Sequence, residues 1–374
     1  MKTLRRVLVA GVLGSLGVVA ARLEACSVPV FRYALEQWPA QRYELTVFHR
    51  GPLGEDQRKV VEWLSKYADA QEPAANLYVR TVDLDGKADE KALELWKAQQ
   101  GASTPLMALT YPESFGTAET AWTGSLGAAE AKAVVDSPAR REIAKRILSG
   151  ESAVWVLLEC GDPKKDDAAA KVLDAELRKL KETLELPEIL QEDVDRGAAA
   201  AVGLKVDFSL LRLSRSDPAE KVFIRMLLGS EAKLATVSEP IALPVFGQGR
   251  ALCGVVGDEI NAENINQIGE FLVGPCSCIV KEQNPGVDLL MSVDWEGGLA
   301  EGRWVKPPEL PALTGPEALV QQARDAGEKG EATSRPAAWR ALTPLGFGIA
   351  GALLVVLAAV VVGTVVLLRR RKSA

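Results

Sequence analysis

Histidine is the scarcest residue in this 374-residue chain, because it occurs only once, at His49. A zinc site built on histidines, a Ser-His-Asp triad or a Cys-His nucleophile would each have to use this one residue. No serine or cysteine near it has the strand-turn-helix context of an activated nucleophile. His49 is therefore interpreted as a structural or surface residue at a strand end, with a functional site on a sheet edge as the alternative.

Cysteine is also rare, and a surplus of basic residues is absent. The five cysteines are Cys26, Cys160, Cys253, Cys276 and Cys278. They are too few to hold a chain of this size together by disulfides, so the fold must depend on a buried hydrophobic core. The net charge of −6 argues against a nucleic-acid-binding protein, which would present a basic face.

The N-terminus has the layout of a secretion signal. Lys2, Arg5 and Arg6 precede an uncharged stretch of about 15 residues, which is too short to cross a bilayer comfortably. We expect a signal peptide over 1–25, with cleavage between Ala25 and Cys26. Leu23 to Cys26 half-resembles a lipoprotein box, so lipidation of Cys26 stays open, as does an uncleaved signal anchor.

The C-terminus predicts one transmembrane helix, over 343–368. Its central part from Leu345 to Leu368 carries no charge and would be about 36 Å long as a helix, enough to span a bilayer. The tail 369–374 follows, with the basic cluster Arg369, Arg370, Arg371 and Lys372. Such a cluster stays cytoplasmic, so the ectodomain is predicted to be periplasmic, in a single-pass protein of a bacterial cell membrane. A stalk rich in Pro, Gly and Ala is expected over 297–342.

The region between the two ends alternates strand and helix patterns, which predicts an α/β fold. Strands are expected at 43–48, 76–84, 106–111 and 121–126, and helices at 56–70, 89–99, 128–135 and 138–148. Pro105 stands immediately before the third strand. This order resembles the thioredoxin-like fold, in which a proline, usually cis, occupies that place. The segment from Cys26 to Pro39 is expected to form a strand and helix covering this first sheet, or else a docking segment that reaches Cys276 and Cys278.

The same order recurs in the second half of the ectodomain. Strands are expected at 153–158, 205–213, 241–246 and 250–256, and helices at 167–184, 218–228 and 264–272. Pro240 repeats the place of Pro105. The sequence therefore predicts two divergent thioredoxin-like units in tandem, 26–150 and 151–296, with a generic pair of α/β domains as the alternative.

The resemblance implies a Cys-x-x-Cys pair at the start of the first helix of each unit, and neither unit has one. The first unit has His49-Arg-Gly-Pro-Leu-Gly54 there, and the second has Cys160-Gly-Asp-Pro163. Dithiol chemistry is therefore not expected at these places. Cys160 by itself is interpreted as a small packed hydrophobic residue, with a redox role as the alternative.

Cys276-Ser277-Cys278 is the most specific local motif. The pair could form a strained disulfide, or offer two soft thiolates to copper(I) or zinc. Each cysteine could instead pair with a different one, for which Cys26 and Cys253 are available.

These patterns support two hypotheses about function. In the first, the chain is a non-catalytic interaction or assembly protein, tethered to the bilayer and bound to another membrane or periplasmic protein. In the second, it is a thiol-redox or copper-handling protein that uses Cys276 and Cys278, with Cys26 as a possible third ligand.

Overall fold

The computed structural model describes residues 27–69, 75–112, 120–193, 204–276 and 280–301. All of them belong to the first of two compact units, 1–317 and 318–374. The predicted signal peptide, Cys26, Cys278, the transmembrane helix, the basic tail and most of the stalk lie outside the described residues. Within those residues, no helix combines the length and apolar composition needed to span a bilayer.

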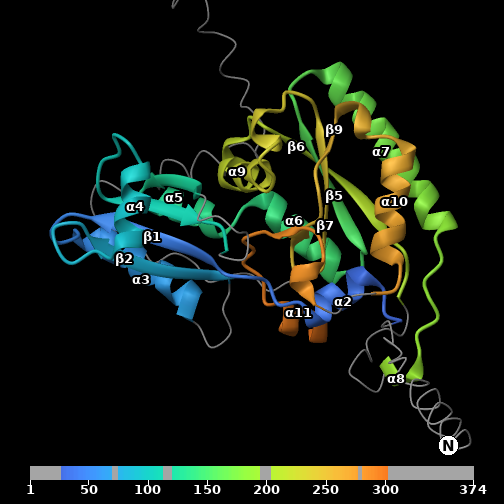
Figure 1. Ribbon diagram of the computed structural model, residues 1–374, viewed down its shortest axis with the longest axis horizontal. Helices are drawn as coiled ribbons and strands as arrows, with labels where there is room; N and C mark the ends of the chain where they lie inside the picture. The colour runs from blue at the N-terminus through green and yellow to red at the C-terminus, as the bar shows by residue number, and fades with distance from the viewer. Residues whose placement is uncertain (1–26, 70–74, 113–119, 194–203, 277–279, 302–374) are drawn as a thin grey trace, which may run out of the picture. The chain divides into compact units, whose positions relative to one another are not determined.

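The described fold is a mixed α/β structure with one four-stranded and one six-stranded sheet, each flanked by helices (Figure 1). The predicted α/β class is therefore confirmed in this coarse form.

The first sheet has the strand order β2-β1-β3-β4. Its strands are β1 (Tyr43–His49), β2 (Leu77–Asp83), β3 (Leu106–Thr110) and β4 (Thr120–Ser125). β1 and β2 are parallel, whereas β3 is antiparallel to both β1 and β4. The helices that accompany it are α3 (Glu55–Asp69), α4 (Glu90–Ala98) and α5 (Ala128–Val135), whereas the next helix, α6 (Pro138–Leu148), packs against β5 of the second sheet (Figure 1). α4 begins where the side chain of Asp89 accepts the N–H of Ala92, as in a standard N-cap.

The second sheet has the order β10-β8-β7-β5-β6, with β9 paired to β7. Its strands are β5 (Ala153–Glu159), β6 (Phe208–Ser214), β7 (Ile241–Phe246), β8 (Arg250–Ala251), β9 (Val255–Val256) and β10 (Val287–Asp288). β5 and β6 are parallel, and β7 is antiparallel to β5. Every residue of β5 up to Leu158 is buried, because helices cover both faces of this strand.

The helices around the second sheet are α7 (Pro163–Thr183), α8 (Gln191–Asp193), α9 (Lys221–Gly229) and α10 (Ala262–Val273), with 3₁₀ turns η4 (Pro218–Glu220), η5 (Leu234–Thr236), η6 (Gly257–Glu259) and η7 (Lys281–Gln283). α7 begins at Pro163 rather than at the expected 167, because Asp162 accepts the N–H of Lys164 and proline suits the first turn. The last described helix is α11 (Trp295–Glu301).

The N-terminal helix α2 (Val30–Gln37) packs on the second sheet, not on the first as expected. Its Phe31 and Ala34 share a hydrophobic cluster with Trp155 of β5 and Phe246 of β7. Sequence order suggested the first sheet, but the apolar face of α2 is complementary to α10 and β7.

The main hydrophobic core contains residues of both sheets. Leu45 and Leu109 of the first sheet belong to the same buried cluster as Val156 and Phe223 of the second region. The two sheets therefore share one core in spite of their repeated topology.

We expect Phe223→Ala to lower the free energy of unfolding by about 3–5 kcal/mol, because Phe223 is fully buried in the shared core. Urea unfolding of the full chain in detergent, followed by tryptophan fluorescence, measures this. Val172→Ala is the control, since Val172 is exposed on α7. Two separate transitions, with only one shifted by Phe223→Ala, would contradict a shared core.

Candidate functional site

Cys160 lies between the end of β5 and the start of α7 in the second sheet. Cys160 is a free, half-buried thiol. The carboxylate of the buried Asp166 accepts the backbone N–H groups of Cys160 at 2.8 Å and of Gly161 at 3.0 Å. Asp162 accepts the N–H of Lys164. Side-chain carboxylates therefore already occupy donors that could otherwise stabilise a thiolate at this helix start.

The electrostatics of this place disfavour a reactive thiolate. The pKa of Cys160 is raised, chiefly by loss of solvent around the sulfur; a hydrogen bond from the backbone of Asp162 opposes this, and the Asp166 carboxylate adds to the increase. Nucleophilic cysteines instead have lowered pKa values. Cys160 is consequently a protonated thiol at neutral pH.

The segment before Pro240 faces this helix start. Arg215 donates to the carbonyl oxygens of Val237 and Glu239, and the Lys165 ammonium lies 2.6 Å from the Glu239 carboxylate. Loss of solvent lowers the pKa of Arg215. The resemblance led us to expect a cis peptide bond before Pro240, but this bond is trans. Within the described residues, the one cis peptide bond is Thr104–Pro105. The trans isomer is the intrinsically preferred one, and the Arg215 contact holds the Glu239 carbonyl in that arrangement.

The corresponding place in the first sheet is the loop after β1. His49 Nδ1 lies 2.8 Å from the carbonyl oxygen of Gly51, so this nitrogen carries the proton and donates. Arg50 forms an exposed ion pair with Asp85 at 2.6 Å. Gly51 has a φ of 61°, which favours glycine. The one histidine is thus held by its own turn, and no sulfur accompanies it in the loop.

We predict that Asp166→Asn lowers the pKa of Cys160, because the carboxylate near the sulfur is replaced by a neutral amide of the same shape. In the wild type, alkylation by iodoacetamide should stay slow at neutral pH and rise only above the ordinary thiol pKa. In the variant, the rate curve should move to lower pH. Mass spectrometry of the Cys160 peptide over a pH series measures the rate. An unmoved curve would show that Asp166 does not control this thiol.

The N-terminal segment forms a short antiparallel ladder with the chain after α10. Val30 N–H donates to Gly274 at 3.0 Å, Cys276 N–H donates to Val28 at 2.9 Å, and Pro29 bridges Pro275. Cys276 is fully buried in the cluster that contains Trp155 and α2. The residues that directly follow Cys26 therefore lie beside Cys276. Cys26 and Cys278 themselves lie outside the described residues, so their pairing stays a prediction.

The remaining cysteine, Cys253, has a free thiol between β8 and β9. It is half-buried against the same cluster, and burial raises its pKa. In the described ranges no group of three or more His, Cys, Asp or Glu side chains is placed to hold a metal ion. A copper or zinc site at Cys276 and Cys278 stays a prediction as well, since Cys278 is outside those ranges.

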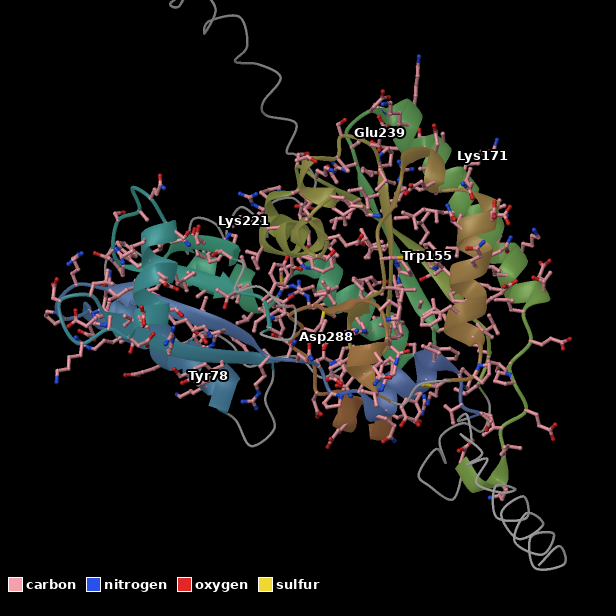
Figure 2. The ribbon with its side chains drawn as sticks, viewed as in Figure 1. Tyr78, Trp155, Lys171, Lys221, Glu239 and Asp288 are labelled. Carbon is pink, nitrogen blue, oxygen red and sulfur yellow. The ribbon has the colours of Figure 1, made fainter. Side chains whose placement is uncertain are left out.

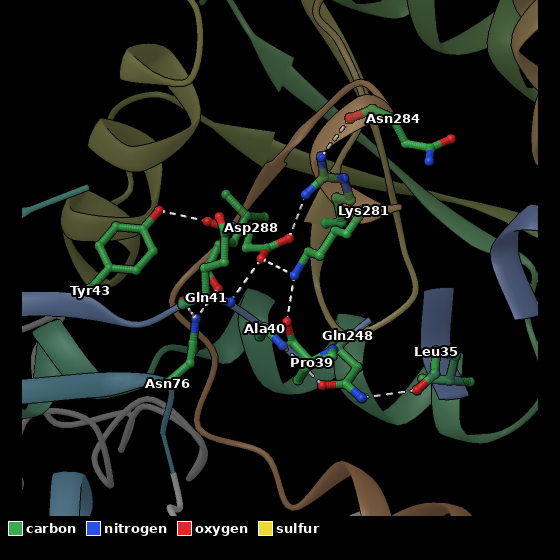
Figure 3. A network of polar contacts seen from close by, with 12 residues as sticks. Leu35, Pro39, Ala40, Gln41, Tyr43, Asn76, Gln248, Lys281, Asn284 and Asp288 are labelled. Carbon is green, nitrogen blue, oxygen red and sulfur yellow. Dashed lines mark hydrogen bonds and ion pairs between the residues drawn. The ribbon is translucent and has the colours of Figure 1, made fainter. Parts of the chain in front are cut away.

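A buried charge network centred on Asp288 was not anticipated from the sequence (Figure 3). The carboxylate is 3% exposed and binds two cations, Arg250 at 2.9 Å and Lys281. It also accepts the backbone N–H of Gln41 at 2.8 Å. Arg250 donates further to the carbonyls of Pro285 and Asn284, so each of its three guanidinium nitrogens has a partner. In the sequence these three charges look like ordinary surface residues, and no periodic pattern marks them.

This network fastens the linker between α2 and β1 to the chain around β10. Lys281 Nζ donates to the carbonyl of Pro39, and the Tyr43 hydroxyl donates to the carbonyl of Asp288 at 2.9 Å. Burial raises the pKa of Tyr43, so its hydroxyl keeps the proton. Nearby, the Asn76 side chain donates to the carbonyls of Gln41 and Leu289, and accepts the N–H of Met291 at 2.7 Å. The segment 281–291 is thereby bonded to elements of both sheets.

Asp288→Ala is expected to cost about 3–5 kcal/mol of unfolding free energy, because Arg250 and Lys281 would stay buried without their carboxylate. Chemical denaturation of the full chain in detergent measures the loss. Lys165→Gln is the matched control, since it breaks an exposed ion pair and should leave the midpoint nearly unchanged. Equal effects of the two substitutions would contradict a stabilising role for the network.

Comparison with known proteins yields no match, either to a protein-family model or to a curated protein. The functional argument therefore depends on the residues described above.

Proposed function

We propose that this chain is a membrane-tethered extracytoplasmic protein whose folded part is a non-catalytic interaction or assembly module, built from two thioredoxin-like units. Its partners are the bilayer and another membrane or periplasmic protein. The tether is the sequence-predicted transmembrane helix 343–368, held by Arg369, Arg370, Arg371 and Lys372 at its cytoplasmic end.

The strand orders support the thioredoxin-like part of this proposal. In the first sheet the order is β2-β1-β3-β4, with β3 antiparallel to its neighbours. In the second sheet β6, β5 and β7 repeat the first three positions with the same directions, and β8 and β9 continue from β7. The cis proline Pro105 stands directly before β3, as in that fold.

One observation carries the non-catalytic part: the carboxylate of Asp166 binds the backbone N–H groups of Cys160 and Gly161. In a thiol enzyme, positive charge and free donors at a helix start stabilise the thiolate. Here a buried negative group occupies these donors, and it adds to the increase in the pKa of the sulfur that loss of solvent chiefly causes. A surface for binding another protein suits this arrangement better than a surface for thiol exchange.

Crosslinking in intact cells of the native host tests the proposal. Wild type and Cys160→Ala should give the same discrete adduct with one protein, because binding does not use the thiol. Loss of the adduct in Cys160→Ala would contradict a non-catalytic role for this site.

The topology is tested separately: protease added to spheroplasts should digest the ectodomain and spare a C-terminal tag. Protection of the ectodomain would contradict the proposed topology.

A second candidate function is copper or thiol handling by Cys276 and Cys278, with Cys26. The ladder between Val28 and Cys276 favours it, since it brings the residues following Cys26 next to this motif. Copper(I) titration of the full chain in detergent, against a competing chelator, tests it. A tight site in the wild type that is lost in Cys278→Ser would support this function. No copper binding, together with disulfides that resist mild reductant, would remove it.

A further inference from the structure

The described fold begins at Ser27, directly after Cys26 and the predicted signal peptide, and ends at Glu301, within the predicted stalk that precedes the transmembrane helix. Both positions lie at the end of the second sheet where β5 and β6 begin. α7 starts beside the end of β5 and runs back along the sheet over 21 residues, about 30 Å. The chain then reaches Asp193, which contacts Ser27. Figure 1 shows α2, α8 and α11 all at this end.

Ser27, the first described residue, is hydrogen-bonded directly to the folded part of the chain. Its backbone N–H and its hydroxyl both donate to Asp193 Oδ2, at 2.8 and 2.5 Å, and Asp193 is itself buried. The hydroxyl also accepts the N–H of Leu190 at 2.8 Å. Only Cys26 stands between Ser27 and the predicted signal peptide, so a leader or lipid retained at Cys26 would attach directly to this rigid point.

The surface beside Ser27 exposes one large apolar side chain, Leu190, among half-buried apolar residues and two glutamates. Leu190 is 53% exposed, the highest value among the large hydrophobic side chains exposed in the described part of the chain. Half-buried Leu186, Pro187 and Ile189 precede it. Glu185 and Glu188 are exposed nearby, so this surface would not be attracted to anionic lipid headgroups. An apolar projection next to the chain's exit suits the headgroup and acyl boundary of a bilayer.

The opposite end of the second sheet is polar. It carries Cys160, Lys165 and Glu239, and the last two form an ion pair that is about half exposed. Figure 2 shows Glu239 at the end of the molecule away from α8. Along β5 alone, the two ends are separated by about 20 Å.

We infer that the end of the fold formed by Ser27, Leu190 and α11 faces the bilayer, and that the end with Cys160 and Glu239 faces away from it. This orientation rests on the proposed membrane tether and deepens it. It assigns Leu190 to the lipid interface and leaves the start of α7 to a partner in the aqueous space.

Photo-crosslinking of the full chain in phosphatidylcholine vesicles tests the orientation. The photoreactive residue p-benzoylphenylalanine replaces Leu190 in one variant, Glu239 in a second and Val172 in a third, all at exposed positions. Mass spectrometry then counts lipid adducts on each. Position 190 should give at least about tenfold more adducts than position 239 or 172, since only it enters the headgroup region.

Two outcomes would overturn the inference, and they are distinguishable. Equal adducts at 190 and 239, with the chain still in the membrane pellet after alkaline carbonate, would show that the tether exists without this orientation. Release of the chain by carbonate would show that the membrane tether itself is wrong. Leu190→Glu, with unchanged circular dichroism, should reduce adducts from a crosslinker placed at Gln191, whereas Val172→Glu should not.

Discussion

The carboxylate of Asp288 is the constraint on which the arrangement of the two sheets most depends. It is buried, it binds Arg250 and Lys281, and it accepts the N–H of Gln41. A buried charge of this kind is costly unless every partner is present, so the linker before β1 and the segment around β10 must come together in one arrangement. The same segment then continues to Asn76 and into the shared core, where Leu289, Leu290 and Met291 are buried.

The contacts around Asp288 make the repeated topology asymmetric. α2 packs on the second sheet although its residues precede the first. The segment 281–291 also contacts the first sheet, through Tyr43 and Asn76, although its strand β10 belongs to the second. The two sheets are thereby connected by chain segments from both ends of the described fold. An interaction module benefits from such rigidity, because a preorganised surface loses less conformational freedom on binding.

The places that would hold reactive thiols in a thioredoxin-like enzyme are instead occupied by structural contacts. Asp166 binds the donors at the start of α7, and His49 is held by the carbonyl of Gly51. Arg215 and Lys165 fasten the segment before Pro240 to the remainder of the sheet. The N–H donors at the start of α7 are thereby occupied by a carboxylate, which supports the proposed binding role.

Much of the fold was predictable from local sequence. β5 is a continuous apolar run, α7 has a clear helical period, and the proline before β3 was visible in place, because hydrophobic periodicity and backbone preferences act over a few residues. The absence of paired cysteines at the helix starts was equally readable. Tertiary structure alone decided that α2 packs on the second sheet, that Pro240 follows a trans bond, and that Arg250, Lys281 and Asp288 meet in the interior. Those outcomes depend on contacts between residues far apart in the sequence, such as Gln41 with Asp288, which are 247 positions apart. No local pattern encodes the burial that makes the interactions of such charges strong.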